Sequence, residues 1–513
     1  MTEITRRKFL KTGAKGAVLI SVPYFFRLNP MAVLAAPEDD LMSVSDYFQH
    51  FGVNGAIIRE VMETALSRGG NYCDLFFQHS INTYIGLEDD VVSRASTSVD
   101  FGVGIRVLKD DQTGYSFTEE ITPEAMKLAA RTAANIASGP AGTTATQFSA
   151  RIPADYYPIR TSWESVEIDK RIPLIQKAGE LAQSKDSRIV KTRAYLSDGV
   201  SYMLLATSEG VVSYDYQPMM RISISCTAEQ NGKRENGSHN LSGRRGIEFI
   251  TDDKIEYMTQ KAVDQTVGLF DAVKPEAGEM PVVLAAGSSG ILLHEAIGHG
   301  MEADFNRKGT SIFADKMGKK VAENFVSIVD DGTNQHMRGS INIDDEGNES
   351  QKTVLVENGI LRSYLHDQIS SRYYKVKPTG NGRRQSFRHQ PLPRMRNTYM
   401  LPGPYKKEEI IASVKKGIFA ETFAGGQVNI GPGDFSFYVK TGFLIEEGKV
   451  TRPVKDINII GNGPEVLGRI SMVADDFKFA EGGWTCGKSG QRVPVSVGLP
   501  SVLVSSITVG GVN

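Results

Sequence analysis

Residues 294–300 read His-Glu-Ala-Ile-Gly-His-Gly, and this heptapeptide is the most informative stretch of the chain. Two imidazoles with a carboxylate beside the first are typical of a hydrolytic zinc site, where the glutamate takes a proton from the metal-bound water. The common His-Glu-x-x-His motif spaces its histidines four residues apart on one helical face. His294 and His299 are five apart, which places them roughly 140° out of register on an ideal helix. Both reach one metal only if the helix bulges or unwinds, and we expect Gly298 to permit this.

The sequence on either side of the heptapeptide predicts the fold of the second half. An apolar run at 281–286 predicts a strand, and Gly-Ser-Ser-Gly at 287–290 predicts a turn and helix cap. The heptapeptide then lies on the helix that follows. Beyond it, short apolar runs separated by glycine and proline, with one clear helix near 408–414, favour a large, mostly antiparallel β domain over 280–513.

The first half mixes helices with strands and predicts an N-terminal α/β domain over 43–273. Apolar periodicity and capping residues, including Thr122-Pro123-Glu124, predict four helices, and β-rich runs predict strands. The helices are expected at 53–66, 122–137, 168–184 and 252–270, the strands at 73–78, 189–196, 202–207 and 211–214, a long connection at 139–157 and a linker at 274–278. The two halves together predict an α+β fold.

The N-terminus has the features of an export signal. Residues 5–11 read Thr-Arg-Arg-Lys-Phe-Leu-Lys, the twin-arginine pattern, and small residues at Ala32, Ala35 and Ala36 favour a cleavage site. The apolar stretch at 14–26 is shorter than the ~20 residues that a spanning helix needs. We therefore predict a signal peptide at 1–36, no membrane span after its removal, and a periplasmic or other extracytoplasmic location. The alternative is an N-terminal anchor or a chance Arg-Arg pair.

Composition limits the classes of partner. The 513 residues carry 58 basic and 60 acidic side chains, so no global field recruits nucleic acid or an anionic membrane. Three cysteines make no disulfide framework. Cys73 and Cys226 lie in apolar strands and are predicted to be core residues.

A tetrahedral zinc site needs a third protein ligand besides His294 and His299. We favour Cys486, because the glycine-rich segment 482–490 lets backbone approach a site closely. A thiolate ligand also accounts for a free cysteine that avoids oxidation. The alternative is a small buried residue at a strand end. The other candidates are the carboxylates and His50, His79, His239, His336, His366 and His389.

Several further motifs follow one another along the chain. They are Glu-Ala-Asp-Phe-Asn-Arg-Lys-Gly-Thr-Ser at 302–311, Gly-Asn-Gly-Arg-Arg at 380–384, Pro-Arg-Met-Arg-Asn-Thr-Tyr at 393–399, Gly-Gly-Gln-Val-Asn at 425–429 and Cys-Gly-Lys-Ser-Gly-Gln at 486–491. Asp-Phe-Gly-Val-Gly-Ile-Arg at 100–106 and Thr-Gly-Tyr at 113–115 precede them. With these motifs and the heptapeptide, the chain resembles the TldD branch of the TldD/PmbA family of zinc peptidases.

The resemblance implies an α/β domain followed by an antiparallel β domain. It also implies that His294, His299 and Cys486 bind Zn²⁺ and that Glu295 is the catalytic general base. Family members typically pair with a PmbA-like subunit that lacks the zinc motif, and the dimer encloses a cavity in which unfolded peptides are cut in extended form. We therefore expect peptide substrates and a homo- or heterodimer. The export signal departs from the family's usual cytoplasmic form.

The chemistry that follows is metal-assisted peptide hydrolysis, with Glu295 passing its proton to the leaving amine. A second oxyanion donor is not identified. Tyr399, His389, Arg394 and Arg396 are candidates, and each also has a structural interpretation. Two rival functions are a non-catalytic modulator that binds another protein and a zinc hydrolase of a non-peptide amide or ester.

The acidic run Asp-Asp-Glu-Gly-Asn at 344–348 lacks the full ligand pattern of a calcium loop. We expect a solvated hairpin turn there.

Overall fold

A computed structural model describes residues 43–511 except 146, 152–153 and 430. The predicted signal peptide at 1–36 lies outside these residues. Within them, no helix is both long enough and apolar enough to cross a membrane.

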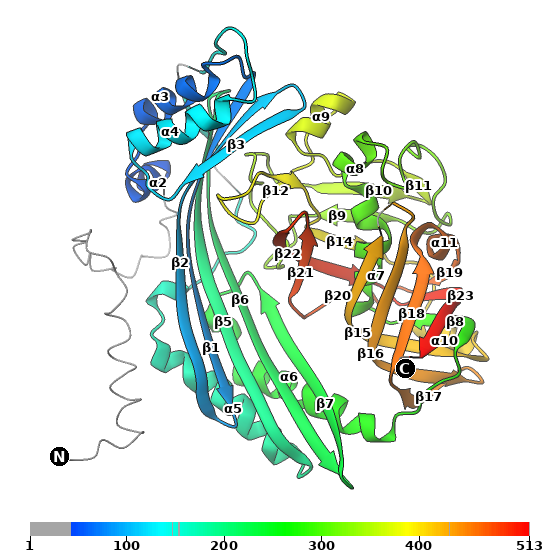
Figure 1. Cartoon of the computed structure of the whole chain (residues 1–513). Helices are drawn as coiled ribbons and strands as arrows, with labels where there is room; N and C mark the ends of the chain where they lie inside the picture. The colour runs from blue at the N-terminus through cyan, green and yellow to red at the C-terminus, as the bar shows by residue number, and fades with distance from the viewer. Residues whose placement is uncertain (1–42, 146, 152–153, 430, 512–513) are drawn as a thin grey trace, which may run out of the picture. The chain divides into compact units, whose positions relative to one another are not determined.

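The first half is built on a seven-stranded sheet in the order β3-β2-β1-β5-β6-β4, with β7 paired to β6. Figure 1 shows β1, β2, β5 and β6 as long neighbouring ribbons. The strands are β1 (Tyr72–Glu88), β2 (Val91–Lys109), β3 (Gln112–Thr118), β4 (Ser149–Arg151), β5 (Ile189–Thr207), β6 (Val211–Gln230) and β7 (Lys233–Gly243). All neighbours are antiparallel except β4 and β6.

The strands of this sheet are longer than the sequence pattern predicted. β5 continues for 19 residues through Ser197-Asp198-Gly199, where two separate strands were expected. Gly199 pairs with Asn82, and a Cβ on Gly199 would lie 2.5 Å from the Asn82 Oδ1 and 2.6 Å from the carbonyl oxygen of Ile81. The glycine therefore permits close approach of a neighbouring strand and does not end β5.

Helices cover this sheet in two groups, each with its own core. The four predicted helices are confirmed with small changes at their ends. They are α3 (Gly55–Leu66), α4 (Pro123–Ala134), α5 (Ile168–Lys185) and α6 (Asp252–Gly268), to which the structure adds α2 (Val44–Phe51). The Thr122 side chain accepts a hydrogen bond from the Ala125 N–H at 3.3 Å, which caps α4 as its sequence predicted.

The second half contains two further seven-stranded sheets and a short β12–β13 pair. Their pairings are antiparallel except β14–β22 and β15–β8, so the predicted α+β class with a mostly antiparallel second half is confirmed. One sheet holds β9 (Ile328–Asp331), β10 (Lys352–Glu357), β11 (Ile360–Leu361), β14 (Asn397–Met400), β20 (Lys478–Phe479), β21 (Trp484–Lys488) and β22 (Gln491–Leu499). The other holds β8 (Gly278–Leu284), β15 (Lys416–Asn429), β16 (Asp434–Glu446), β17 (Lys449–Val454), β18 (Ile457–Asn462), β19 (Ile470–Val473) and β23 (Val502–Gly511). The short pair is β12 (Gly382–Arg383) with β13 (Leu392–Pro393).

The heptapeptide helix packs against both of these sheets. Its first turn, α7 (Ile291–Leu293), contacts β14 and β22, and the next turn contacts β15, β16 and α11 (Gly463–Gly468). One hydrophobic cluster includes Leu293, Ile297 and residues from both sheets. Short helices α8 (Ala303–Arg307), α9 (Gln368–Tyr374) and α10 (Lys407–Ala412) complete the half, and α10 confirms the helix expected near 408–414. The predicted domain boundary between 273 and 280 stays a prediction.

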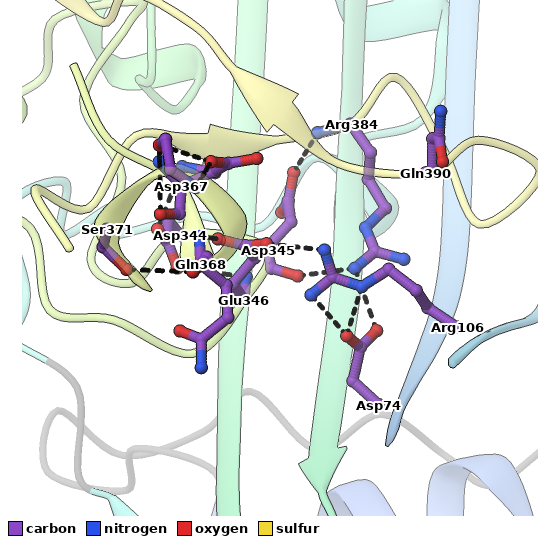
Figure 2. Close-up of polar contacts among 12 residues, drawn as sticks. Asp74, Arg106, Asp344, Asp345, Glu346, Asp367, Gln368, Ser371, Arg384 and Gln390 are labelled. Atoms are coloured by element: carbon purple, nitrogen blue, oxygen red, sulfur yellow. Dashed lines mark hydrogen bonds and ion pairs between the residues drawn. The ribbon is translucent and has the colours of Figure 1, made fainter. Parts of the chain in front are cut away.

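A buried network of ion pairs, here called the tie, joins the first sheet to the second half (Figure 2). Arg106 on β2 pairs with Asp74 on β1 at 2.5 Å and with Glu346 at 2.6 Å, and Arg384 reaches Asp74 at 3.2 Å. All four side chains are at most 1% exposed. The turn predicted at 344–348 is confirmed, since Ile343 and Glu349 pair as an antiparallel bridge across it. Its predicted solvation is wrong, because arginines and backbone N–H groups from other segments neutralise its buried carboxylates.

Candidate metal centre

The backbone of the heptapeptide contains the irregularity that its spacing required. Residues His294–Gly298 form a π-helical turn, in which the N–H of His299 donates to the carbonyl of His294. The extra residue per turn brings both imidazoles to one side, with ring centroids 5.0 Å apart. The predicted bulge is confirmed.

Gly298 has a different role from the one expected of it. Its φ of −55° and ψ of −51° are ordinary right-handed helical values, so the turn does not depend on glycine flexibility. A Cβ on Gly298 would lie 1.9 Å from the Met395 Sδ. Glycine here leaves the space that the Met395 side chain occupies against the helix.

Cys486 lies on β21 and meets the two histidines. Its Sγ is 3.3 Å from the His299 Nε2, and one ligand atom from each of His294, His299 and Cys486 lies within 4.8 Å of the other two. All three side chains are buried. Among the described residues, none of the other histidines belongs to a group of three potential ligands.

This donor set fits a zinc ion. Tetrahedral coordination with Zn–N of about 2.0 Å and Zn–S of about 2.3 Å separates nitrogen and sulfur ligands by roughly 3.6 Å. The 3.3 Å contact between Cys486 and His299 is close to that value. The His294 Nδ1 is buried and has no hydrogen-bond partner among the described residues. Imidazole nitrogen and thiolate sulfur are both ligand types that zinc binds in proteins.

Electrostatics favours the ligating form of the cysteine. Burial alone would raise the pKa of the Cys486 thiol, but His294 and His299 outweigh burial and hold it well below its usual value. The Glu295 carboxylate lies 4.0 Å from the His299 Nε2. Burial raises the pKa of Glu295 despite the two histidines. A thiolate and a carboxylate therefore face the same small space.

A buried carboxylate and a buried lysine orient His299. The Glu302 Oε2 is 2.9 Å from the His299 Nδ1, and the Lys488 Nζ is 3.1 Å from the same oxygen. Lys488 also contacts Asp304 at 2.7 Å. Burial opposes ionisation of Glu302, but Lys488 and His299 lower its pKa to about 2. A carboxylate behind a ligating histidine fixes the ring and its tautomer.

Sequence reasoning assigned no role to Glu302 or Lys488. The available signal was spacing, because Glu302 follows His299 by three residues and Lys488 follows Cys486 by two. Positions two apart share one face of a strand, so Lys488 points the same way as Cys486.

The four candidates for a second oxyanion donor do not converge on the centre. Only Arg394 touches the ligand strand, where it donates to the carbonyl oxygen of Cys486 at 2.7 Å. The other three contact groups away from the centre. Arg396 donates to Asp330 at 2.9 Å, Tyr399 donates to Asp331 at 3.2 Å, and the His389 ring lies 3.0 Å from the Ser386 hydroxyl. These contacts give Arg396, Tyr399 and His389 structural roles.

Comparison with known proteins matches nearly the whole described chain to one family. Residues 73–137 match the PmbA/TldA metallopeptidase domain 1, residues 161–270 the central domain and residues 277–511 the C-terminal domain. The heptapeptide and Cys486 both fall in the third match.

Two curated relatives carry descriptive names. A metalloprotease TldD homolog of Haemophilus influenzae is 42% identical over 453 residues, which cover 87% of this chain and 94% of that protein. A zinc metalloprotease TldD homolog of Saccharolobus solfataricus is 35% identical over 291 residues, covering 56% and 64%. The second name mentions the metal that the donor set fits.

Solved structures share the fold at low sequence identity. A putative modulator of a DNA gyrase from Thermotoga maritima has a TM-score of 0.73 at 22% identity, covering 90% of this chain and all of that one. TldE from Thermococcus kodakarensis has a TM-score of 0.66 at 19% identity, covering 89% and 99%. At these identities the likeness establishes the fold alone.

Proposed function

This chain belongs to the PmbA/TldA metallopeptidase family, and from that premise we propose that it is a zinc-dependent peptidase acting on unfolded or extended peptides. The observation that carries the proposal is the buried His294, His299 and Cys486 cluster with Glu295 beside it. A buried thiol with two imidazoles and an adjacent carboxylate has no evident structural purpose, but it is the arrangement that hydrolytic zinc sites use.

In this proposal His294, His299 and Cys486 hold the metal. Bound zinc would supply Lewis acidity, which lowers the pKa of a water molecule and polarises a carbonyl group. Glu302 keeps the His299 ring in place through its Nδ1, and Lys488 neutralises Glu302. All three ligands are buried, so bulk solvent has little access to them.

Glu295 is the proposed general base. Its carboxylate is partly exposed and lies 4.0 Å from the His299 Nε2, close to the space that the ligand atoms surround. A carboxylate there can take a proton from the attacking nucleophile and give it to the leaving amine. We assign no second oxyanion donor, because Arg394 contacts the strand of Cys486 through one nitrogen bound to the Cys486 carbonyl and, in the described part of the chain, forms no hydrogen bond with His294, His299 or Glu295.

We further propose that the chain acts as a dimer, with itself or with a PmbA-like subunit. The family resemblance supports the second arrangement, and a chain named TldE shares this fold. Export by the twin-arginine route also belongs to the proposal and rests on residues 5–11. A fusion of residues 1–42 to a reporter, with Arg6 and Arg7 changed to Lys as control, tests export directly.

The peptidase proposal is tested with a digest of a peptide library by the purified mature chain, alone and with a co-expressed PmbA-like subunit. We expect cleavage that a chelator abolishes and added zinc restores. Glu295→Gln should lose at least about 100-fold in rate while binding zinc normally, since general base catalysis contributes roughly 10²–10⁴-fold. No chelator-sensitive cleavage under either condition would contradict the proposal.

A non-catalytic modulator is the second candidate, because a fold neighbour is described as a putative modulator of a DNA gyrase. Glu295→Gln separates the two functions, since a binding protein keeps its role without this carboxylate. Complementation of a deletion strain by Glu295→Gln would favour the modulator. Cleavage of model amides or esters without cleavage of peptides would instead favour a non-peptide hydrolase.

A further inference from the structure

Several cationic side chains near the candidate metal centre have no acidic partner. Arg221 and Arg244 form no ion pair and no side-chain hydrogen bond with any described residue. Each instead lies over an aromatic ring, Arg221 over Tyr195 at 5.6 Å and Arg244 over Tyr157 at 5.0 Å. Arg244 is only 2% exposed. Buried charges are normally paired, so an unpaired guanidinium at this depth requires an explanation.

Arg338 connects these arginines to the strand that carries Cys486. Its guanidinium donates to the Trp484 carbonyl at 3.0 Å and to the Ser242 hydroxyl at 3.1 Å, and it has no acidic partner among the described residues. Ser242 pairs with Arg221 across β6 and β7. Arg338 and Arg221 therefore meet beside Trp484, which precedes Cys486 by two residues, or about 7 Å of extended chain.

Arg244 lines a cavity of about 250 Å³ between the first sheet and the second half. Arg383, Pro494 and Asp345 are part of the same lining, while Arg221 and Arg338 lie outside it. Pro494 lies opposite Thr485 in the β21–β22 pair, next to the pairing position of Cys486. The cavity is thus adjacent to the ligand strand.

Carboxylates near these cations are bound to other groups. In the described residues none of them forms an ion pair with Arg221, Arg244 or Arg338. Asp215 accepts from Tyr157 and Asn342, Asp345 accepts the N–H of Arg384, and Glu481 contacts His239 and Tyr257. Asp215 and Asp345 still interact with Arg244 at longer range.

Electrostatics supports the geometry. Burial, together with Arg221 and Arg244, lowers the pKa of Arg338 to about 10. The pKa of Arg383 is lowered to about 9, chiefly by burial. The charges of Arg244 and Arg394 also lower it, while Asp345 and Asp330 act in the opposite direction. These groups remain cationic at neutral pH. They repel one another, and a bound anion would relieve that repulsion.

We propose that Arg221, Arg244 and Arg338 form an anion subsite that binds a carboxylate of the peptide. The subsite deepens the proposed function and rests on it. Guanidinium groups match carboxylates through paired, charge-assisted hydrogen bonds. An extended peptide advances about 3.3 Å per residue, so the carboxylate lies about two to four residues from the bond that is cut. It belongs to an Asp or Glu side chain or to the C-terminus of the peptide.

Peptide binding to the zinc-loaded Glu295→Gln chain tests the subsite without turnover. The probe is a labelled peptide with no acidic residue and an amidated C-terminus. A second peptide carries one Glu, and a third carries a free C-terminal carboxylate. We expect the Glu or the free-carboxylate peptide to bind about tenfold tighter than the neutral one, and the arm that gains affinity identifies the source.

Substitutions then locate the effect. Arg221→Gln should reduce the carboxylate preference to about threefold or less, whereas Arg221→Lys should keep most of it. Arg193→Gln is the matched control, because Arg193 lies on the same sheet with its side chain 67% exposed. Neutral-peptide affinity should not change in any of these variants.

Two results would overturn the subsite. One is that the wild-type site binds neutral and carboxylate peptides with equal affinity. The other is that Arg221→Gln lowers the affinity for all three peptides by the same factor. Failure of the peptidase proposal is a separate result, because the wild-type chain would then cleave none of the peptides while the binding preference persists.

Discussion

Two groups of buried or half-buried arginines in this protein differ in how their charge is balanced. In the tie, Arg106 has Asp74 and Glu346 within 2.6 Å (Figure 2). In the proposed subsite, Arg221 and Arg244 lie over aromatic rings and form no ion pair with a described residue, while Asp215 and Asp345 act on Arg244 only at longer range. A cation whose partner belongs to the chain stabilises the fold. A cation with no such partner has its charge free for a ligand.

The candidate metal centre resembles the proposed subsite in this respect. Its potential ligand atoms face one another, and the charged groups behind them, Glu302 and Lys488, form an ion pair with each other. The charges of the supporting groups are balanced within the chain. The atoms that would meet metal or substrate have no such balancing partner. The predictions below test this contrast, beginning with the largest effect.

Cys486→Ser should remove zinc binding, because it replaces the only thiol of the cluster by a weak ligand. Mutation of a group that only hydrogen-bonds to a metal ligand costs about 10–100-fold in metal affinity. Loss of a ligand itself should therefore lower zinc affinity by more than about 100-fold. Metal analysis and competition with a chromogenic chelator measure it. Cys226→Ser, a buried thiol outside the cluster, is the control. Equal zinc retention by both variants would exclude Cys486 as a ligand.

Arg106→Met should lower the free energy of unfolding by about 3–5 kcal/mol, because it leaves the buried Glu346 without an ion-pair partner and Asp74 with Arg384 alone. Arg221→Met should change it by less than about 1 kcal/mol, since no acidic partner is lost. Denaturant unfolding of both zinc-loaded variants compares them. Similar destabilisation by the two substitutions would contradict the inference that Arg106 stabilises the fold and Arg221 does not.

Glu302→Gln should weaken zinc binding by about 10–100-fold through loss of the charged partner of His299. Asp304→Asn is the matched control, because Asp304 contacts Lys488 but neither histidine. Chelator competition at fixed pH gives both values. A larger effect in Asp304→Asn would show that Lys488, and not Glu302, governs the site.

The pH dependence of stability provides the smallest expected effect. The His50 Nε2 is 2.9 Å from the His79 Nδ1, and burial with this neighbour lowers the pKa of His79 to about 4. The unfolded chain binds that proton near pH 6.5. The unfolded state then holds more protons between about pH 6.5 and 4, so stability falls as the pH falls through this window. His79→Gln should flatten the unfolding curve there, and an unchanged slope would assign the loss to other groups.

Local rules predicted much of the secondary structure. Helix periodicity and capping placed α3, α4, α5 and α6 within a few residues, because both signals act over a single turn. Strand lengths were predicted less well. Polar residues and Gly199 interrupt the apolar pattern of β5, but pairing with β1 continues across them. Strand length depends on the neighbouring strand, which no local pattern describes.

The sequence by itself determined that the heptapeptide helix must deform, because five-residue spacing on a helix is a local geometric constraint. It did not determine why residue 298 is glycine, since that depends on Met395. Tertiary structure alone brought Cys486 to His299 across 187 residues and decided which arginines are paired. Ligand geometry and Coulomb energy depend on distance in space, and sheet pairing sets that distance.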